Sequence, residues 1–262
     1  DRDSGRSARK PVMLLLVLAQ LAPLAGPPAP ARPEADCLAD VRADSARAIQ
    51  AATAWHLAGG GALAKQCLAL AYAAQERWSA AAVAFEQAAR EAEAAEPAAA
   101  ANLWVQAGNA RLAAGEPTPA RAALDRALAS GHLVGLSLGE ARLDRARANV
   151  ALAALPAARA DLDEALALAA DDPLAWLLSA NLARRMGDLA RAERDITEAA
   201  ARAPDDAEVA YEAGMIAYAT GAAEAARIAW AGAIKAQPGS DAARRAQAAL
   251  DRLAADAQPR EP

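Results

Sequence analysis

Aromatic side chains are scarce in this sequence of 262 residues. It contains five Trp, three Tyr and one Phe, so few large rings are available to fill a core. The strands of β-sandwiches and β-barrels favour aromatic and β-branched residues, and the scarcity therefore argues against both classes. Alanine occupies 86 positions, and it has the highest helix propensity of all residues. We therefore expect an all-α protein whose helices pack closely through small side chains.

Metal ligands, basic charge and catalytic motifs are also sparse. The two histidines and two cysteines lack the spacing of a zinc site, so we expect no metal and no cofactor. With 28 basic and 33 acidic residues, the net charge is −5, and no net basic field would attract nucleic acid. The glycines at 59–61 follow an expected helix and lack the Lys-Ser/Thr of a phosphate loop. The sequence predicts a protein that is not an enzyme.

The first 31 residues have the parts of a secretory signal peptide. Four basic residues within 2–10 precede an apolar run at 12–25, and Ala29-Pro30-Ala31 fits a cleavage site. The run of 14 residues is short for a spanning helix, which needs about 20. We expect residues 1–31 to be removed and the mature chain to be periplasmic or secreted. The alternative is an uncleaved anchor in the inner membrane. Arginine outnumbers lysine by 25 to 3, which indicates a bacterium with a GC-rich genome.

Cys37 and Cys67 are candidates for a disulfide, because an even number of cysteines in an oxidising compartment suggests pairing. The alternative is two separate buried thiols. If one straight helix ran over 38–58, Cys37 would lie about 30 Å from the turn at 59–61, and Cys67 only about 10 Å from it. A bridge therefore requires a helix that begins near Asp44, with Cys37 folding back. Both alternatives stay open at this point.

An internal repeat of 34 residues runs through most of the chain. In segment 173–206, large residues stand at places 4 and 24, small residues at places 8, 20 and 27, Gly at place 15 and Pro at place 32. These residues are Trp176, Ile196, Ala180, Ala192, Ala199, Gly187 and Pro204. The next segment repeats the pattern with Gly214, Gly221, Ala226, Trp230, Ala233 and Pro238. The preceding segments supply Ala146, Ala158, Leu162 and Ala165, then Trp104, Gly108, Gly115, Ala120, Leu124 and Ala127, then Ala69, Ala81, Phe85 and Ala88.

These residues resemble the tetratricopeptide repeat (TPR) family, whose pattern is W-x₂-L-G-x₂-Y…A-x₃-F…P over 34 residues. The resemblance implies a right-handed α-solenoid of about five helix pairs. The small residues stand where helices approach most closely, and the large ones fill the space beside those contacts. The five predicted units are 62–95, 101–134, 139–172, 173–206 and 207–240.

The segments outside the units are also assigned by the sequence. Residues 32–61 are expected to form an N-terminal segment with a capping helix over 38–58, and residues 241–255 a C-terminal capping helix. Residues 256–262 are expected to be a disordered tail. Unit one departs from the pattern with Glu76 at place 15, where Gly is usual. Between units two and three, 131–138 adds four residues, either as a break in the superhelix or as a lengthened connection.

The resemblance implies that the first helices of successive units line a concave groove that binds a peptide or protein. Asn at place 9 is suited to hydrogen-bond a peptide backbone, and arginines are suited to pair with a carboxylate. Three large residues of unit five would lie open in the groove, or else pack against the C-terminal helix. The candidate groove residues are Asn109, Arg147, Asn181, Arg185, Tyr211, Met215 and Tyr218. The family's carboxylate clamp needs Lys at place 5, where Val105 and Leu177 stand, so a clamp for chaperone C-termini is not expected.

The predicted function is that of a non-catalytic interaction scaffold in the bacterial cell envelope, with a protein or peptide partner. A second hypothesis is a membrane-tethered assembly factor or co-chaperone that keeps its N-terminal anchor, and only then would a membrane be a partner. A third is a repeat-built enzyme or sugar-binding domain, which would need convergent carboxylates or a metal site.

Overall fold

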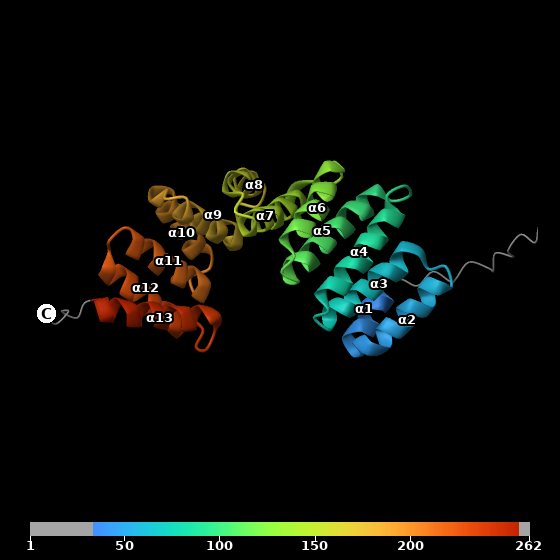
Figure 1. Cartoon of the computed structure of the whole chain (residues 1–262), viewed down its shortest axis with the longest axis horizontal. Coiled ribbons are helices and arrows are strands. Elements are labelled where there is room, and N and C mark those ends of the chain that lie inside the picture. Colours follow the sequence, from blue (N-terminus) through green and yellow to red (C-terminus); the bar gives the residue numbers. More distant parts are fainter. Residues whose placement is uncertain (1–33, 257–262) are drawn as a thin grey trace, which may run out of the picture.

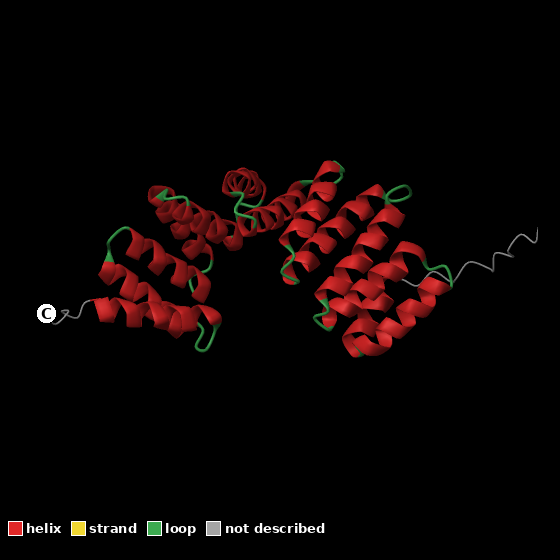
Figure 2. Cartoon of the chain, in the orientation of Figure 1, coloured by secondary structure: helices red, strands yellow, loops and turns green. Residues whose placement is uncertain are grey.

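The computed structural model describes residues 34–256, and within them the chain forms thirteen helices and no strand (Figure 2). The helices are α1 (Glu34–Ala43), α2 (Ser45–Leu57), α3 (Gly61–Ala74), α4 (Trp78–Ala92), α5 (Pro97–Ala113), α6 (Pro117–Ala129), α7 (Gly135–Ala151), α8 (Leu155–Leu168), α9 (Pro173–Arg185), α10 (Leu189–Arg202), α11 (Ala207–Ala219), α12 (Ala223–Ala236) and α13 (Asp241–Asp256). The predicted signal peptide, 1–31, and residues 257–262 of the predicted tail lie outside the described residues.

The helices pack as successive pairs that stack into an arch (Figure 1). The pairs are α3–α4, α5–α6, α7–α8, α9–α10 and α11–α12, with α1 and α2 at one end of the arch and α13 at the other. Near the middle of the arch, α7 lies between α8 and the hollow, so that α8 is on the outer side (Figure 1). This is the predicted α-solenoid of five helix pairs.

Small residues allow the two helices of a pair to approach closely. A Cβ added at Gly108 would lie 2.6 Å from Cγ of Leu124, and one at Gly214 would lie 2.4 Å from the indole of Trp230. Both glycines stand at place 8, so each large side chain of the second helix packs directly against first-helix backbone. Trp104 and Trp230, which the sequence predicted to be core residues, are 4% and 2% exposed.

The turn between the two helices of a unit has the same backbone conformation in all five units. The residue at place 15 has a positive φ throughout, with values of 72°, 81° and 82° at Gly115, Gly187 and Gly221. Glu76 and Ala153 stand at the same place in units one and three, with φ of 56° and 57°. This left-handed conformation is the usual end of a helix for glycine but is costly for residues with a Cβ. The packing of the pair therefore imposes the turn even where the sequence lacks glycine.

The single helix predicted over 38–58 is wrong, because the chain breaks there into α1 and α2. Asp44 lies at the break, and its carboxylate accepts hydrogen bonds from the backbone N–H groups of Ala46 and Arg47, both at 3.0 Å. An aspartate in this position satisfies the free donors at a helix start. The break lets α1 fold back against both α2 and α3.

Cys37 in α1 and Cys67 in α3 form a disulfide in the structure, with their Cα atoms 5.7 Å apart. The folding back of Cys37 is the arrangement that the reach argument required for a bridge. Both sulfurs are buried in a small cluster with Ala52 and Trp55 of α2. The disulfide thus joins the N-terminal helix to the first helix of unit one.

The residues in excess of the 34-residue period lengthen two first helices. Helix α5 begins at Pro97 and α7 at Gly135, each four residues before the start of the predicted unit. Of the segment 131–138, only the first part remains a connection, since α6 ends at Ala129 and α7 has already begun at Gly135. Each insertion therefore adds about one helical turn to the following first helix.

Ala153→Gly is expected to raise the free energy of unfolding by about 1 kcal/mol, because glycine carries little penalty at a positive φ. Chemical denaturation of the purified chain would measure this change. Gly187→Ala is the matched variant at the same place of unit four, and we expect it to lower the free energy of unfolding by a similar amount. A destabilising effect of Ala153→Gly would contradict the strain that we assign to this turn.

Candidate functional site

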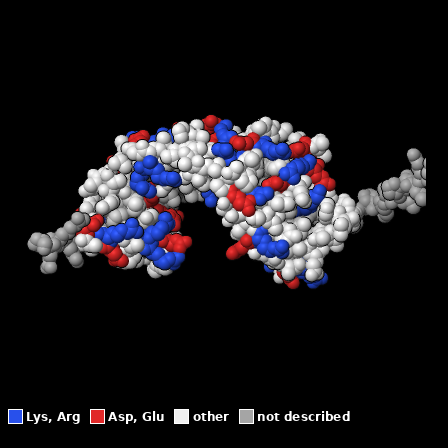
Figure 3. Space-filling view, viewed as in Figure 1, with Lys and Arg blue, Asp and Glu red and all other residues white. Residues whose placement is uncertain are grey.

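The predicted groove residues lie on four first helices that face the hollow side of the arch. Asn109 is on α5, Arg147 on α7, Asn181 and Arg185 on α9, and Tyr211, Met215 and Tyr218 on α11. In the space-filling view, basic and acidic side chains lie next to one another on both sides of the hollow (Figure 3). The predicted residues thus extend along the arch rather than gathering at one point, which suits an elongated ligand better than a small one.

Asn109 and Arg147 are brought together by a carboxylate that the sequence analysis did not single out. Asp144 of α7 accepts a hydrogen bond from Arg147 Nη1 at 3.1 Å and is also hydrogen-bonded by Asn109 of α5. Burial raises the pKa of Asp144, and the hydrogen bond from Asn109 and the positive charge of Arg147 offset only part of this increase. The cluster therefore links α5 to α7, and the partial burial of Asp144 makes its charged form less favourable than in water.

Asn181 belongs to a similar link between α9 and α11. Its Nδ2 donates to Oε2 of Glu212 at 3.0 Å, and Arg184 donates to both oxygens of Glu212, at 2.6 Å and 3.2 Å. Glu212 is only 3% exposed, so this bidentate pair satisfies a buried charge. Arg184 is committed to the link, whereas its neighbour Arg185 is exposed.

Place 6 is the common feature of these links. Asp144 and Glu212 both stand at place 6 of their units, and so does Cys67, which forms the disulfide with α1. Each of the three residues bonds to an earlier helix that is not its direct neighbour in the sequence: Cys67 to α1, Asp144 to α5 and Glu212 to α9. The recurrence of Cys, Asp and Glu at one place of the repeat is a signal that sequence comparison between the units could have revealed.

The links change the role that we assign to the two asparagines. Each was predicted to bind a peptide backbone, but the structure engages both in hydrogen bonds to a carboxylate of the next unit. An Asn amide has two donor hydrogens and one acceptor oxygen, so part of its capacity remains for a ligand. Asn109 and Asn181 lie in different links and do not contact one another.

Two of the three large residues of α11 pack against the C-terminal helix. The guanidinium of Arg245, on α13, lies 4.5 Å from the ring centre of Tyr211 and forms an ion pair with Glu208. Met215 is half-buried in the cluster that joins α11, α12 and α13. This packing agrees with the second of the two roles that the sequence left open for them.

Tyr218, Leu174 and Arg185 are exposed residues of the first helices α9 and α11. Tyr218 is 47% exposed, and its ring centre lies 5.9 Å from that of the buried Trp230. Leu174, at the start of α9, is 44% exposed, and Arg185 is exposed at the end of the same helix. The groove therefore offers an aliphatic, an aromatic and a cationic side chain to a ligand.

Residues 34–256 contain no group of three or more His, Cys, Asp or Glu side chains that could hold a metal ion. None of the helices in this part of the chain is both long enough and apolar enough to cross a membrane.

Comparison with known proteins shows the fold of this chain. No protein-family model matches the sequence, and no curated protein matches it. Solved structures do match. PilW, described as a type IV pilus biogenesis factor, is 21% identical with a TM-score of 0.65, and the match covers 82% of this chain and 96% of PilW.

Two further structures match in the same way. PilF of Pseudomonas aeruginosa is 15% identical with a TM-score of 0.65, covering 82% of this chain and 95% of PilF. YrrB, described as a TPR protein with an unusual peptide-binding site, is 20% identical with a TM-score of 0.54, covering 71% of this chain and 92% of YrrB. The chain has the tetratricopeptide repeat fold, as the sequence predicted.

Asp144→Asn is expected to raise the free energy of unfolding at about pH 7 and to change it little at about pH 3. The raised pKa means that the native state binds more protons than the unfolded state as the carboxyl ionises, so stability falls as pH rises through this range. Denaturation curves at both pH values would measure the difference. Glu140→Gln, which removes an exposed carboxylate from the same helix, is the matched control. Destabilisation by Asp144→Asn at neutral pH would contradict the cost that we assign to the buried charge.

Proposed function

We propose that this chain is a non-catalytic interaction scaffold that binds a segment of a partner protein in the groove of its first helices. The observation that carries the proposal is the open part of the groove, where Leu174, Arg185 and Tyr218 are exposed on adjacent first helices. Exposed apolar side chains together with arginine are typical of surfaces that bind other proteins. The fold supports the same proposal, since YrrB, which shares it, is described as having a peptide-binding site.

The bound segment would lie along the arch. Leu174 and Tyr218 would contact apolar side chains of the partner, and Arg185 would pair with a carboxylate. The Asn109 and Asn181 amides would contribute their remaining hydrogen-bonding capacity to the partner's backbone. The lateral links hold the first helices at a fixed spacing, so the ligand would meet a preformed surface and lose less entropy on binding.

We further propose that the protein is exported to the bacterial cell envelope, as a periplasmic or secreted protein. The basic residues before the apolar run at 12–25 support export, and so does the disulfide between Cys37 and Cys67, since such bonds persist in oxidising compartments. The alternative is a membrane-tethered assembly factor that keeps the apolar run as its anchor. PilW, which has the same fold, is described as a pilus biogenesis factor.

A photo-crosslinking residue placed at Leu174 is expected to yield a discrete crosslinked product in the native host. The same residue at Ile228, an exposed apolar position on α12, is the matched control and is expected to yield none. Arg185→Glu, added to the chain that carries the photo-crosslinking residue in place of Leu174, should weaken crosslinking by about tenfold, because the pairing of Arg185 with a carboxylate of the partner is lost. Equal crosslinking from both positions, or none from Leu174, would contradict binding in the groove.

Fractionation of host cells that express the full chain tests its location. We expect a periplasmic or secreted form that begins at Arg32 and whose two cysteines react with iodoacetamide only after reduction. Recovery with the membranes, with residues 12–25 still present, would favour the tethered assembly factor. A full-length cytoplasmic form with reactive thiols would contradict export.

A further inference from the structure

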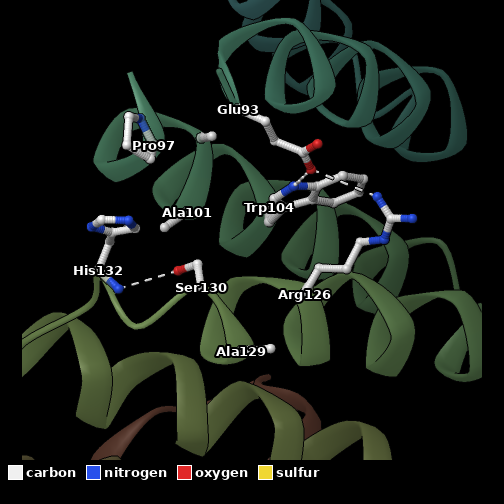
Figure 4. A pocket seen from close by; sticks show the side chains of 9 residues that line it. Glu93, Pro97, Ala101, Trp104, Arg126, Ala129, Ser130 and His132 are labelled. Atoms are coloured by element: carbon white, nitrogen blue, oxygen red, sulfur yellow. Dashed lines mark hydrogen bonds and ion pairs between the residues drawn. The ribbon is translucent and has the colours of Figure 1, made fainter. Parts of the chain in front are cut away.

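A second concave site lies beside the first helix of unit two. It is a cavity of about 410 Å³ between α4 and α6, which are the second helices of their pairs, and the first half of α5 forms its floor (Figure 4). Its apolar wall is made by Pro97, Ala101, Ala129 and the indole of Trp104. None of the predicted groove residues lines it.

The first departure from the 34-residue period lines this cavity, and the second follows it in the sequence. Pro97 belongs to the residues between units one and two, which lengthen α5 at its start. His132 belongs to the connection between α6 and α7, and the second insertion follows it as the added first turn of α7. The extra turn of α5 extends the floor, and the connection closes one end of the cavity. Unit two is the unit that has an insertion on each side.

Unit four shows the same surroundings without the insertions. Trp176 stands at the place of Trp104, but its Nε1 donates to the carbonyl of Ala170 at 2.7 Å. Arg202 lies over the ring at 5.2 Å and donates to the same carbonyl at 2.9 Å, so its side chain crosses this region. In unit two, Trp104 donates to Glu93 at 2.9 Å, and the guanidinium groups of Arg126 and Arg90 lie 4.8 Å and 5.5 Å from the centre of its ring. A cavity of about 410 Å³ remains beside the indole.

The walls of the cavity are suited to one large apolar side chain. Alanines and a proline project little into the space, and Trp104, which is 4% exposed and lies under the guanidinium of Arg126, completes the apolar lining. A volume of about 410 Å³ falls within the range of about 300–1,000 Å³ that is usual for ligand pockets. Aromatic side chains gain most from such burial, because each can bury about 150–250 Å² and stack against another ring.

The rim of the cavity favours a negative charge. Arg126 is 58% exposed in its side chain, and its nearest carboxylate oxygen, on Glu93, lies at 3.7 Å, which is longer than a hydrogen bond. Its guanidinium has five N–H donors and is therefore able to receive a second carboxylate in bidentate form. A smaller cavity of about 230 Å³ continues beyond Trp104 and Arg126 and is lined by two further arginines, Arg90 and Arg111. Arg90 is paired with Glu86, and Arg111 is paired with both Glu86 and Glu116, so Arg126 is the arginine of the two cavities that can best receive a ligand carboxylate.

We propose that this cavity is a docking site for an extended segment of a partner protein that inserts an aromatic side chain beside Trp104. An adjacent Asp or Glu of the same segment pairs with Arg126. The site shares no lining residue with the predicted groove, so the scaffold holds two protein segments at once. The proposal does not depend on what the groove binds.

Selection of random short peptides on the full chain, followed by fluorescence anisotropy with the enriched peptides, tests the proposal. We expect enrichment of an aromatic residue next to Asp or Glu. Ala129→Trp fills the cavity from an exposed position and should weaken binding by at least about tenfold. Ala201→Trp is the matched control, because Ala201 is exposed at the same place of unit four, and it should leave binding unchanged.

Charge reversal tests the second contact. Arg126→Glu is expected to weaken binding of the enriched peptides by about tenfold, whereas Arg194→Glu, on the exposed side of α10, should have no effect. Leu174→Asp, in the groove, should also leave the affinity unchanged. The proposal is overturned if no peptide is enriched, if Ala129→Trp binds like the unaltered chain, or if Leu174→Asp abolishes binding. If Arg126→Glu bound the enriched peptides as tightly as the unaltered chain does, the proposed pairing of Arg126 with a carboxylate of the partner would be overturned.

Discussion

Close approach between the helices of a pair is the constraint on which the rest of this structure depends. Gly108 and Gly214 leave no room for a Cβ, since Leu124 and Trp230 pack directly against the backbone of the first helix. This contact sets the distance between the two helices and the turn that joins them. The turn then imposes a left-handed residue even at Ala153, which has the Cβ that this conformation disfavours. Local strain is tolerated because the packing of the pair determines the backbone.

The stacking of pairs depends on a second, lateral set of contacts. At place 6, a disulfide joins α3 to α1, a partly buried aspartate joins α7 to α5, and a buried glutamate joins α11 to α9. The chemistry differs from link to link, but the position is the same. These links occupy the hollow side of the arch, where a ligand would also lie. The groove is therefore partly a structural element, and its free surface is confined to side chains such as Leu174, Arg185 and Tyr218.

Regular repeats and their interruptions contribute differently to this molecule. The regular units supply the arch and a continuous row of first helices. The two insertions lengthen α5 and α7, and the added turn of α5, which begins at Pro97, extends the floor of the cavity beside Trp104. Irregular residues in a repeat array thus create a local site that the repeat itself lacks.

The helix pairs, their small contact residues and the all-α class followed from the sequence alone, because the spacing of Trp, Gly and Ala reflects local packing within one unit. Three features did not follow from the sequence: the break at Asp44, the additional turns of α5 and α7, and the partners of the predicted groove residues. The sequence predicted that the amides of Asn109 and Asn181 are free to bind a ligand. Their partners, Asp144 and Glu212, are 35 and 31 positions away, so no pattern of neighbouring residues indicates the contacts. Only the superhelix decides which residues of successive units meet, because that depends on the summed rotation between pairs. Tertiary structure therefore decided how much of the groove is open and where the second cavity lies.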